Sequence, residues 1–179
     1  MSSSQKVAIR IGEFIKVLAD MTLKTSVISD SSGLENKLEE VGLASLEKAG
    51  ITELLIAQIF VDQIPINKFL VAKKRSYLLD SYFKEIYSLL IGNFRYFQHK
   101  QELMLFETLI QARFREFYET LDESGVNYVS LGREVAKNLA SKKLSSPLLC
   151  LALGVSLRSR ETTMQGFLEE TSAKFEIIY

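Results

Sequence analysis

The sequence has very few of the residues from which metal sites and covalent cross-links are built. Its 179 residues include one cysteine, Cys150, one histidine, His99, and no tryptophan. A single cysteine excludes a disulfide within the chain and a zinc site built from cysteines. A single histidine excludes a metal site in which one chain supplies two histidine ligands. We therefore expect neither a metal nor a cofactor.

An excess of charge of either sign is also missing. Lysine and arginine number 22, and so do aspartate and glutamate, so the chain lacks the basic excess that binds a phosphate backbone. Basic residues form only short clusters, at 73–75, 142–143 and 158–160. The segment 25–49, where a helix-turn-helix regulator would need a basic recognition helix, is mostly acidic. We therefore expect that nucleic acid is not a partner.

Long hydrophobic runs are missing as well. The stretch behind the first methionine is interrupted by Arg10, Glu13 and Lys16, so it does not resemble a signal peptide. The longest nearly apolar run, 147–157, is far shorter than the ~20 residues that cross a bilayer. Together with the single cysteine, which forms no disulfide within the chain, these features predict a cytoplasmic protein without a membrane span.

Two prolines and nine glycines are few for a turn-rich β protein, and apolar residues recur at helical spacing. The sequence therefore predicts one all-α domain over 1–179, a bundle of about eight helices, with a flexible segment at 1–5 and a loop at 25–33. The expected helices span 5–24, 34–50, 51–64, 67–91, 94–122 (with 98 as an alternative start), 130–142, 147–157 and 161–175.

Local signals place several of these boundaries. Ser32 and Glu35 have the spacing of a capping box, and Ser146 before Pro147 is typical of a helix start. Pro65 is expected to end or kink the apolar helix 51–64, which we expect to be buried at the centre. A tight turn at Gly92 and Asn93 would fold the helices 67–91 and 94–122 into a long central hairpin.

Aromatic residues are concentrated in that hairpin. Eleven of the eighteen lie between Tyr77 and Tyr118. They either form the core alone, or they exceed what one core absorbs and line an interface or a ligand pocket. The candidate interface or pocket residues are Tyr82, Phe83, Tyr87, Phe94, Tyr96, Phe97, Phe106, Ile110, Arg113, Phe114, Phe117 and Tyr118.

No motif for catalysis is present: the sequence has neither a Gly-x-Ser-x-Gly elbow nor a glycine-rich phosphate loop. We therefore expect a non-catalytic helical module for interaction or regulation, which binds another protein or itself as a homodimer. One alternative is a sensor for a small apolar ligand. Its cavity would lie among Tyr82, Phe83, Phe94, Phe106 and Ile110.

A second alternative is a histidine phosphotransfer module. His99 would be the phosphoacceptor, because it is the only side chain with an ordinary pKa near neutrality. Glu102 lies three residues further along the chain and shares its helix face. The apolar Leu103 after these residues does not fit the usual pattern of such modules.

Overall fold

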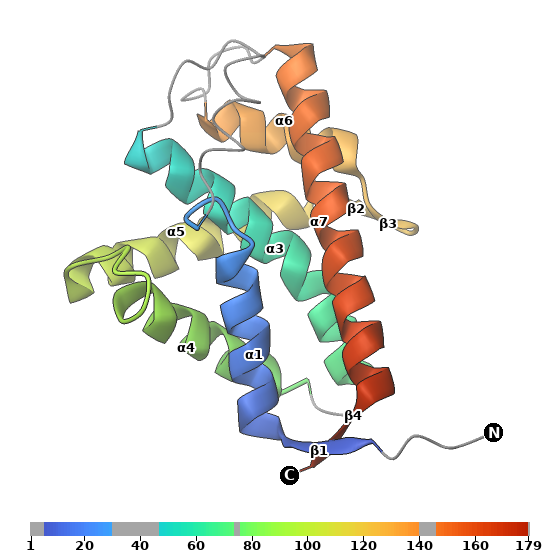
Figure 1. The fold of residues 1–179 in the computed structure, drawn as a ribbon. Helices are drawn as coiled ribbons and strands as arrows, with labels where there is room; N and C mark the ends of the chain where they lie inside the picture. Colours follow the sequence, from blue (N-terminus) through green and yellow to red (C-terminus); the bar gives the residue numbers. More distant parts are fainter. Residues whose placement is uncertain (1–5, 30–46, 74–75, 140–145, 179) are drawn as a thin grey trace.

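The computed structural model describes residues 6–29, 47–73, 76–139 and 146–178, and within them the chain is mostly helical. Six helices and four short strands lie in these ranges (Figure 1), where the sequence predicted about eight helices. In chain order they are β1 Val7–Arg10, α1 Ile11–Lys24, α3 Lys48–Ala72, α4 Leu78–Ile91, α5 Lys100–Tyr118, β2 Leu121–Asp122, β3 Gly125–Val126, α6 Tyr128–Leu139, α7 Pro147–Lys174 and β4 Phe175–Ile178.

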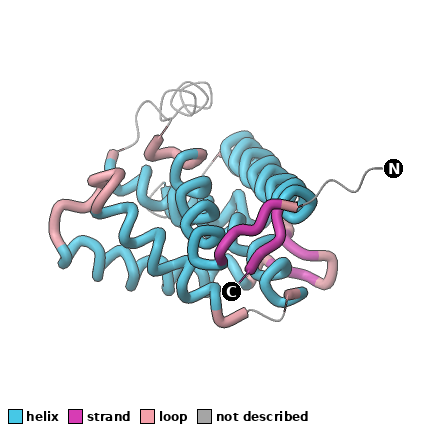
Figure 2. The backbone as a smooth tube through the Cα atoms, turned by 60° about the horizontal axis from the view of Figure 1, so that its bottom comes forward, coloured by secondary structure: helices cyan, strands magenta, loops and turns pink. Residues whose placement is uncertain are grey.

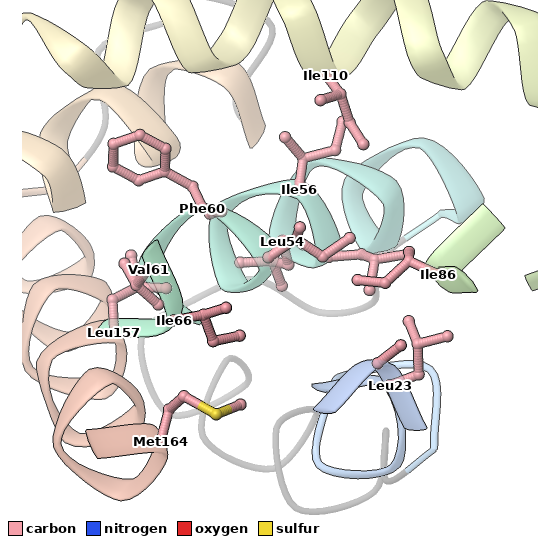
Figure 3. Close-up of a cluster of buried hydrophobic side chains, with 14 of the residues drawn as sticks. Leu23, Leu54, Ile56, Phe60, Val61, Ile66, Ile86, Ile110, Leu157 and Met164 are labelled. Carbon is pink, nitrogen blue, oxygen red and sulfur yellow. The ribbon is translucent and has the colours of Figure 1, made fainter. Parts of the chain in front are cut away.

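Helix α3 lies at the centre and contacts α1, α4, α5, α6 and α7. Leu55, Ile56, Ile59 and Phe60 on this helix are completely buried. Figure 3 shows side chains from α1, α4, α5 and α7 converging on it. The prediction of a central apolar helix is confirmed. The prediction that the aromatic hairpin forms the centre is wrong, because α4 and α5 instead pack against this helix.

Pro65 does not end α3, which continues through it to Ala72. A proline inside a helix costs about 3 kcal/mol, because it removes a hydrogen bond and crowds the preceding turn. Ile66 and Leu70, which follow it, are almost completely buried. Burial of two such side chains contributes about 3–6 kcal/mol, which offsets the cost of the proline. The helix therefore ends at Ala72, before α4, and not at Pro65 as predicted.

The predicted helix 67–91 is therefore two separate helices, of which the second is α4. It ends at Ile91 before Gly92, as predicted. The predicted helix 94–122 is shorter than expected, because α5 begins at Lys100 and ends at Tyr118. The chain then forms the small β2–β3 hairpin, in which Gly125 has a φ of 122°, a conformation that favours glycine.

The two predicted C-terminal helices are one helix, α7. It begins at Pro147 with Ser146 at the N-cap, as predicted. The sequence predicted separate helices over 147–157 and 161–175, but no glycine or proline interrupts the helix between them. Met164 and Leu168 continue the buried face beyond that point, so packing extends the helix through the charged turn.

Helices α6 and α7 approach each other through glycine. A Cβ atom on Gly132 would lie 2.1 Å from the carbonyl oxygen of Cys150, and one on Gly154 would lie 2.4 Å from that of Tyr128. No side chain fits at either distance, so the two backbones are in direct contact. This contact fixes the position of the N-terminal half of α7.

The ends of the described chain form a two-stranded parallel sheet, β1 with β4, rather than helix (Figure 2). Val7 pairs with Phe175 and Arg10 pairs with Ile178. The predicted helix 5–24 therefore begins later, at Ile11. Local spacing does not reveal such a strand, because its partner lies at the other end of the sequence.

The predicted helix 34–50 falls mostly outside the described residues, as do Ser32 and Glu35 of its capping box. Gly50, the expected end of that helix, lies in the first turn of α3. Among the described helices, α3 alone is long and apolar enough to cross a membrane, and 67% of its most apolar window is buried inside the protein. Core helices of soluble proteins meet the same criterion, so the absence of a membrane span remains a prediction.

Candidate functional site

The aromatic candidates divide between the core and the surface. The buried rings are Tyr82, Phe97, Phe106 and Phe117. The half-buried rings are Phe83, Tyr87, Phe94, Tyr96 and Phe114, and Tyr118 is 49% exposed. The hydroxyl of Tyr82 is 2.8 Å from Oγ1 of Thr22, so its burial leaves no unpaired polar atom there. The core absorbs part of the cluster and leaves the rest at the surface.

Ring contacts connect α4 and α5 to each other and to α3. The ring of Phe60 lies 5.2 Å from Phe114 and 5.2 Å from Tyr118, both on α5, in edge-on arrangements. Phe83 of α4 lies 5.9 Å from Phe114. Such pairs contribute about 0.5–1.5 kcal/mol each beyond the area that they bury. The half-exposed rings are thus held in place by buried ones.

Between α4 and α5 these rings leave a depression of about 680 Å³, which we call the α4–α5 groove. Residues from both helices and Gln63 from α3 form its walls: Gln63, Leu79, Asp80, Phe83, Tyr87, Ile110, Gln111, Phe114, Arg115 and Tyr118. Nε2 of Gln63 donates a hydrogen bond to the hydroxyl of Tyr118 at 2.8 Å. The groove therefore has mostly apolar walls, with a fixed polar contact beside the most exposed ring.

One charge of each sign borders the groove. Asp80 is on the α4 wall and Arg115 is on the α5 wall, and both are exposed. In the part of the chain that the structure describes, neither forms an ion pair. Both charges are therefore available to a molecule that covers the groove.

Arg113, a predicted interface residue, lies away from the groove wall. Its Nε and NH2 atoms donate to the two carboxylate oxygens of Glu53, at 2.7 and 2.8 Å. Its NH1 atom donates to Glu116 at 3.0 Å, and Asn138 donates to the same carboxylate at 3.2 Å. Arg113 thus connects α3, α5 and α6 within the chain, and it does not line the α4–α5 groove.

The remaining aromatic candidates lie at the other end of α5. The hydroxyl of Tyr96 is 2.9 Å from Oγ1 of Thr52, and Nζ of Lys48 lies 5.5 Å and 5.7 Å from the ring centres of Tyr96 and Phe97. Phe94 is half-buried against the core. None of these three rings lines the groove. Tyr96 and Phe97 hold the connection before α5 against the start of α3.

The cavity predicted among Tyr82, Phe83, Phe94, Phe106 and Ile110 is not formed by those residues together. Tyr82 and Phe106 are sealed in the core, and only Phe83 and Ile110 reach the groove.

His99 is exposed at the N-cap of α5. The carboxylate of Glu102 accepts hydrogen bonds from the backbone N–H groups of Gln98 and His99, at 2.8 and 3.3 Å. These bonds lower the pKa of Glu102. Capping of a helix start accounts for this pair of residues.

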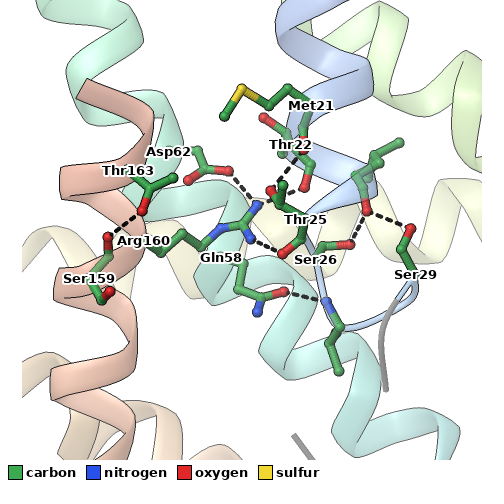
Figure 4. A network of polar contacts seen from close by, with 12 residues as sticks. Met21, Thr22, Thr25, Ser26, Ser29, Gln58, Asp62, Ser159, Arg160 and Thr163 are labelled. Carbon is green, nitrogen blue, oxygen red and sulfur yellow. Dashed lines mark hydrogen bonds and ion pairs between the residues drawn. The ribbon is translucent and has the colours of Figure 1, made fainter. Parts of the chain in front are cut away.

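A cluster of polar residues that the sequence patterns did not predict joins α1, α3 and α7 (Figure 4). Arg160 of α7 donates to the carbonyl oxygens of Thr25 and Thr22 at the end of α1, at 2.6 and 2.7 Å. Its NH2 atom also donates to Oδ2 of Asp62 at 2.5 Å. Arg160 thus supplies a positive charge to the negative end of α1 and a partner to a buried carboxylate.

Asp62 is almost completely buried, at 1% exposure. Burial raises its pKa from the usual 3.8 to about 7, because desolvation disfavours the carboxylate more than Arg160 and the Thr22 side chain together favour it. Oδ1 of Asp62 and Nε of Arg160 have no hydrogen-bond partner among the described residues. The pair is therefore incompletely satisfied.

The sequence does contain a signal for this site. Asp62 is the only charged residue between Glu53 and Lys68, in a mostly apolar stretch of helix. A carboxylate in such a position requires a buried partner. Arg160 follows the predicted end of the helix 147–157, where a basic residue would face the carbonyl groups of its own helix. In the structure it donates to the carbonyl groups at the end of α1.

Within the described ranges, no cluster of three or more histidine, cysteine, aspartate or glutamate side chains has the arrangement of a metal site. Comparison of the chain with protein-family models, with curated proteins and with solved structures found no match.

Proposed function

We propose that this protein is a non-catalytic interaction module that associates with a second copy of itself through the α4–α5 groove. The observation that carries this proposal is a set of half-exposed rings, held by buried ones, beside one charge of each sign that forms no ion pair with the described residues. Exposed aromatic and arginine side chains are the residues that most often contribute strongly to binding.

The positions of the charges favour a second copy over a different protein. In a two-fold symmetric interface the same surface of both copies meets itself. Asp80 of one copy can then lie against Arg115 of the other, and each pair occurs twice. A surface with charges of a single sign would repel its own copy, whereas this one is complementary to itself.

Sedimentation equilibrium of charge-reversed variants tests the proposal. We expect the natural chain to dimerise reversibly. Asp80→Arg and Arg115→Asp should each weaken the dimer about tenfold or more, since each places like charges together, and about 1.4 kcal/mol corresponds to tenfold. The double variant exchanges the two charges and should recover most of the lost affinity.

Arg133→Asp is the matched control, because Arg133 is exposed on α6, outside the groove. It should leave the dimerisation constant unchanged. A strictly monomeric natural chain at high concentration would contradict the proposal. So would a double variant that is no tighter than the two single variants.

A further inference from the structure

A cavity of about 710 Å³ lies between α1, α3 and α7. That volume is within the ~300–1,000 Å³ of typical small-molecule sites. It is lined by Met21, Thr25, Gln58, Asp62, Leu148, Leu151, Ala152, Val155, Ser156, Leu157, Ser159, Arg160, Thr163 and Met164. It shares no residue with the α4–α5 groove, so binding in this cavity does not depend on self-association.

One wall of this cavity is apolar and remains exposed. Leu148, Leu151 and Val155 are 59%, 51% and 69% exposed, and their spacing places them on one face of α7. The close contact of α6 with Gly154, on another face of α7, holds this part of the helix in place. The wall is thus a fixed apolar surface that a ligand could cover without rearrangement of the backbone.

The base of the cavity is polar and incompletely satisfied. Asp62 and Arg160 both line it, yet Oδ1 of Asp62 and Nε of Arg160 have no partner in the described part of the chain. Buried polar atoms in proteins are almost always hydrogen-bonded. One acceptor and one donor therefore remain for a ligand at the apolar-walled cavity.

The charges at the base of the cavity restrict the charge that the head group of a ligand can carry. Asp62 and Arg160 carry opposite charges, so a head group of either charge would meet a like charge within the same pair. The other polar residues of the cavity, such as Gln58, Ser159 and Thr163, are uncharged. A hydroxyl group donates one hydrogen bond and accepts another, which matches the carboxylate oxygen and the guanidinium N–H.

We propose that this cavity binds an uncharged amphipathic alcohol. Its hydroxyl group lies against Asp62 and Arg160, and its apolar body covers Leu148, Leu151 and Val155. Such a molecule places apolar surface on the exposed wall and brings no net charge to the buried pair.

Isothermal titration calorimetry of the full chain at pH 8 with three probes of equal length tests the head group. We expect 1-octanol to bind at one site per chain, and octanoate and octylamine to bind at least tenfold more weakly. Equal affinity for all three probes would overturn the assignment of an uncharged head group. Absence of 1-octanol binding would overturn the site itself.

A matched pair of valine variants tests the location. Val155→Glu places a charge in the apolar wall at an exposed position, so the fold should be kept, and 1-octanol should bind at least tenfold more weakly. Val129 is 52% exposed on α6 and lies outside the cavity, so Val129→Glu should bind 1-octanol like the natural chain. Unchanged affinity in Val155→Glu, or an equal loss in Val129→Glu, would place any bound alcohol elsewhere.

Discussion

Two arginines attach other helices to α3, and they do so in different ways. Arg113 binds Glu53 with two parallel hydrogen bonds and reaches Glu116 with a third donor, at a site where Glu53 is 11% exposed. Arg160 shares its donors between Asp62 and two backbone carbonyl groups, and Asp62 is only 1% exposed. Among the described residues, the first pair is satisfied, whereas the second has one donor and one acceptor without a hydrogen-bond partner.

This difference in hydrogen bonding distinguishes a structural connection, Arg113 with Glu53, from a candidate binding site, Arg160 with Asp62. Two-point arginine–carboxylate pairs hold their geometry and stabilise a fold. A buried pair with unmet hydrogen bonds carries the cost of desolvation without full compensation. We therefore assign a purely structural role to Arg113 and Glu53, and we propose a structural and ligand-binding role for Asp62 and Arg160.

Arg160→Met should have the largest effect on stability. It leaves Asp62 buried without a charged partner and removes two hydrogen bonds from the end of α1. Loss of one partner of a buried pair costs about 3–5 kcal/mol. Urea denaturation at pH 8 measures this loss, and a loss below about 1 kcal/mol would show that the pair contributes little.

The pH dependence of the free energy of unfolding should reveal the buried carboxyl group of Asp62. Below about pH 4 Asp62 is protonated in both the folded and the unfolded chain. Between pH 4 and pH 7 the folded chain holds a proton that the unfolded chain has lost, because the pKa is raised on folding. The contribution of Asp62 to the free energy of unfolding therefore falls by about 1.4 kcal/mol for each pH unit in this range. Above pH 7 it is constant.

Asp62→Asn should remove this decrease, whereas Glu53→Gln should keep it. Urea denaturation curves of the three proteins from pH 4 to pH 8 provide the measurement. A slope that persists unchanged in Asp62→Asn would assign the pH dependence to another group.

Arg113→Met should cost less than Arg160→Met, about 1–3 kcal/mol. Glu53 and Glu116 keep some contact with solvent, with side chains 11% and 42% exposed, so water replaces part of the lost hydrogen bonding. The same denaturation experiment gives the value. A loss as large as that of Arg160→Met would remove the distinction between the two pairs.

Local patterns in the sequence predicted the elements that local interactions determine. The start of α7 at Pro147 and the end of α4 at Ile91 depend on capping and turn residues that act within a few positions. The central place of α3 results from its apolar residues on all sides. The hydrophobic spacing also predicted that several of the rings between Tyr77 and Tyr118 would be buried.

Contacts between distant residues account for what the sequence did not predict. Strand β1 exists because Val7 meets Phe175, and α3 continues through Pro65 because Ile66 and Leu70 reach the core. The pairing of Asp62 with Arg160 joins residues 98 positions apart. Each outcome depends on tertiary packing, which residue spacing along one helix does not contain.

The pKa of the Asp62 carboxyl group is the most direct test of the incompletely satisfied pair. Carbon-13 NMR of the aspartate side chains across a pH titration, assigned by comparison with Asp62→Asn, measures it. We expect a midpoint near 7 for Asp62, because its burial outweighs the attraction of Arg160. A midpoint below 4 would show a fully compensated ion pair and would contradict the incomplete satisfaction of Asp62 and Arg160.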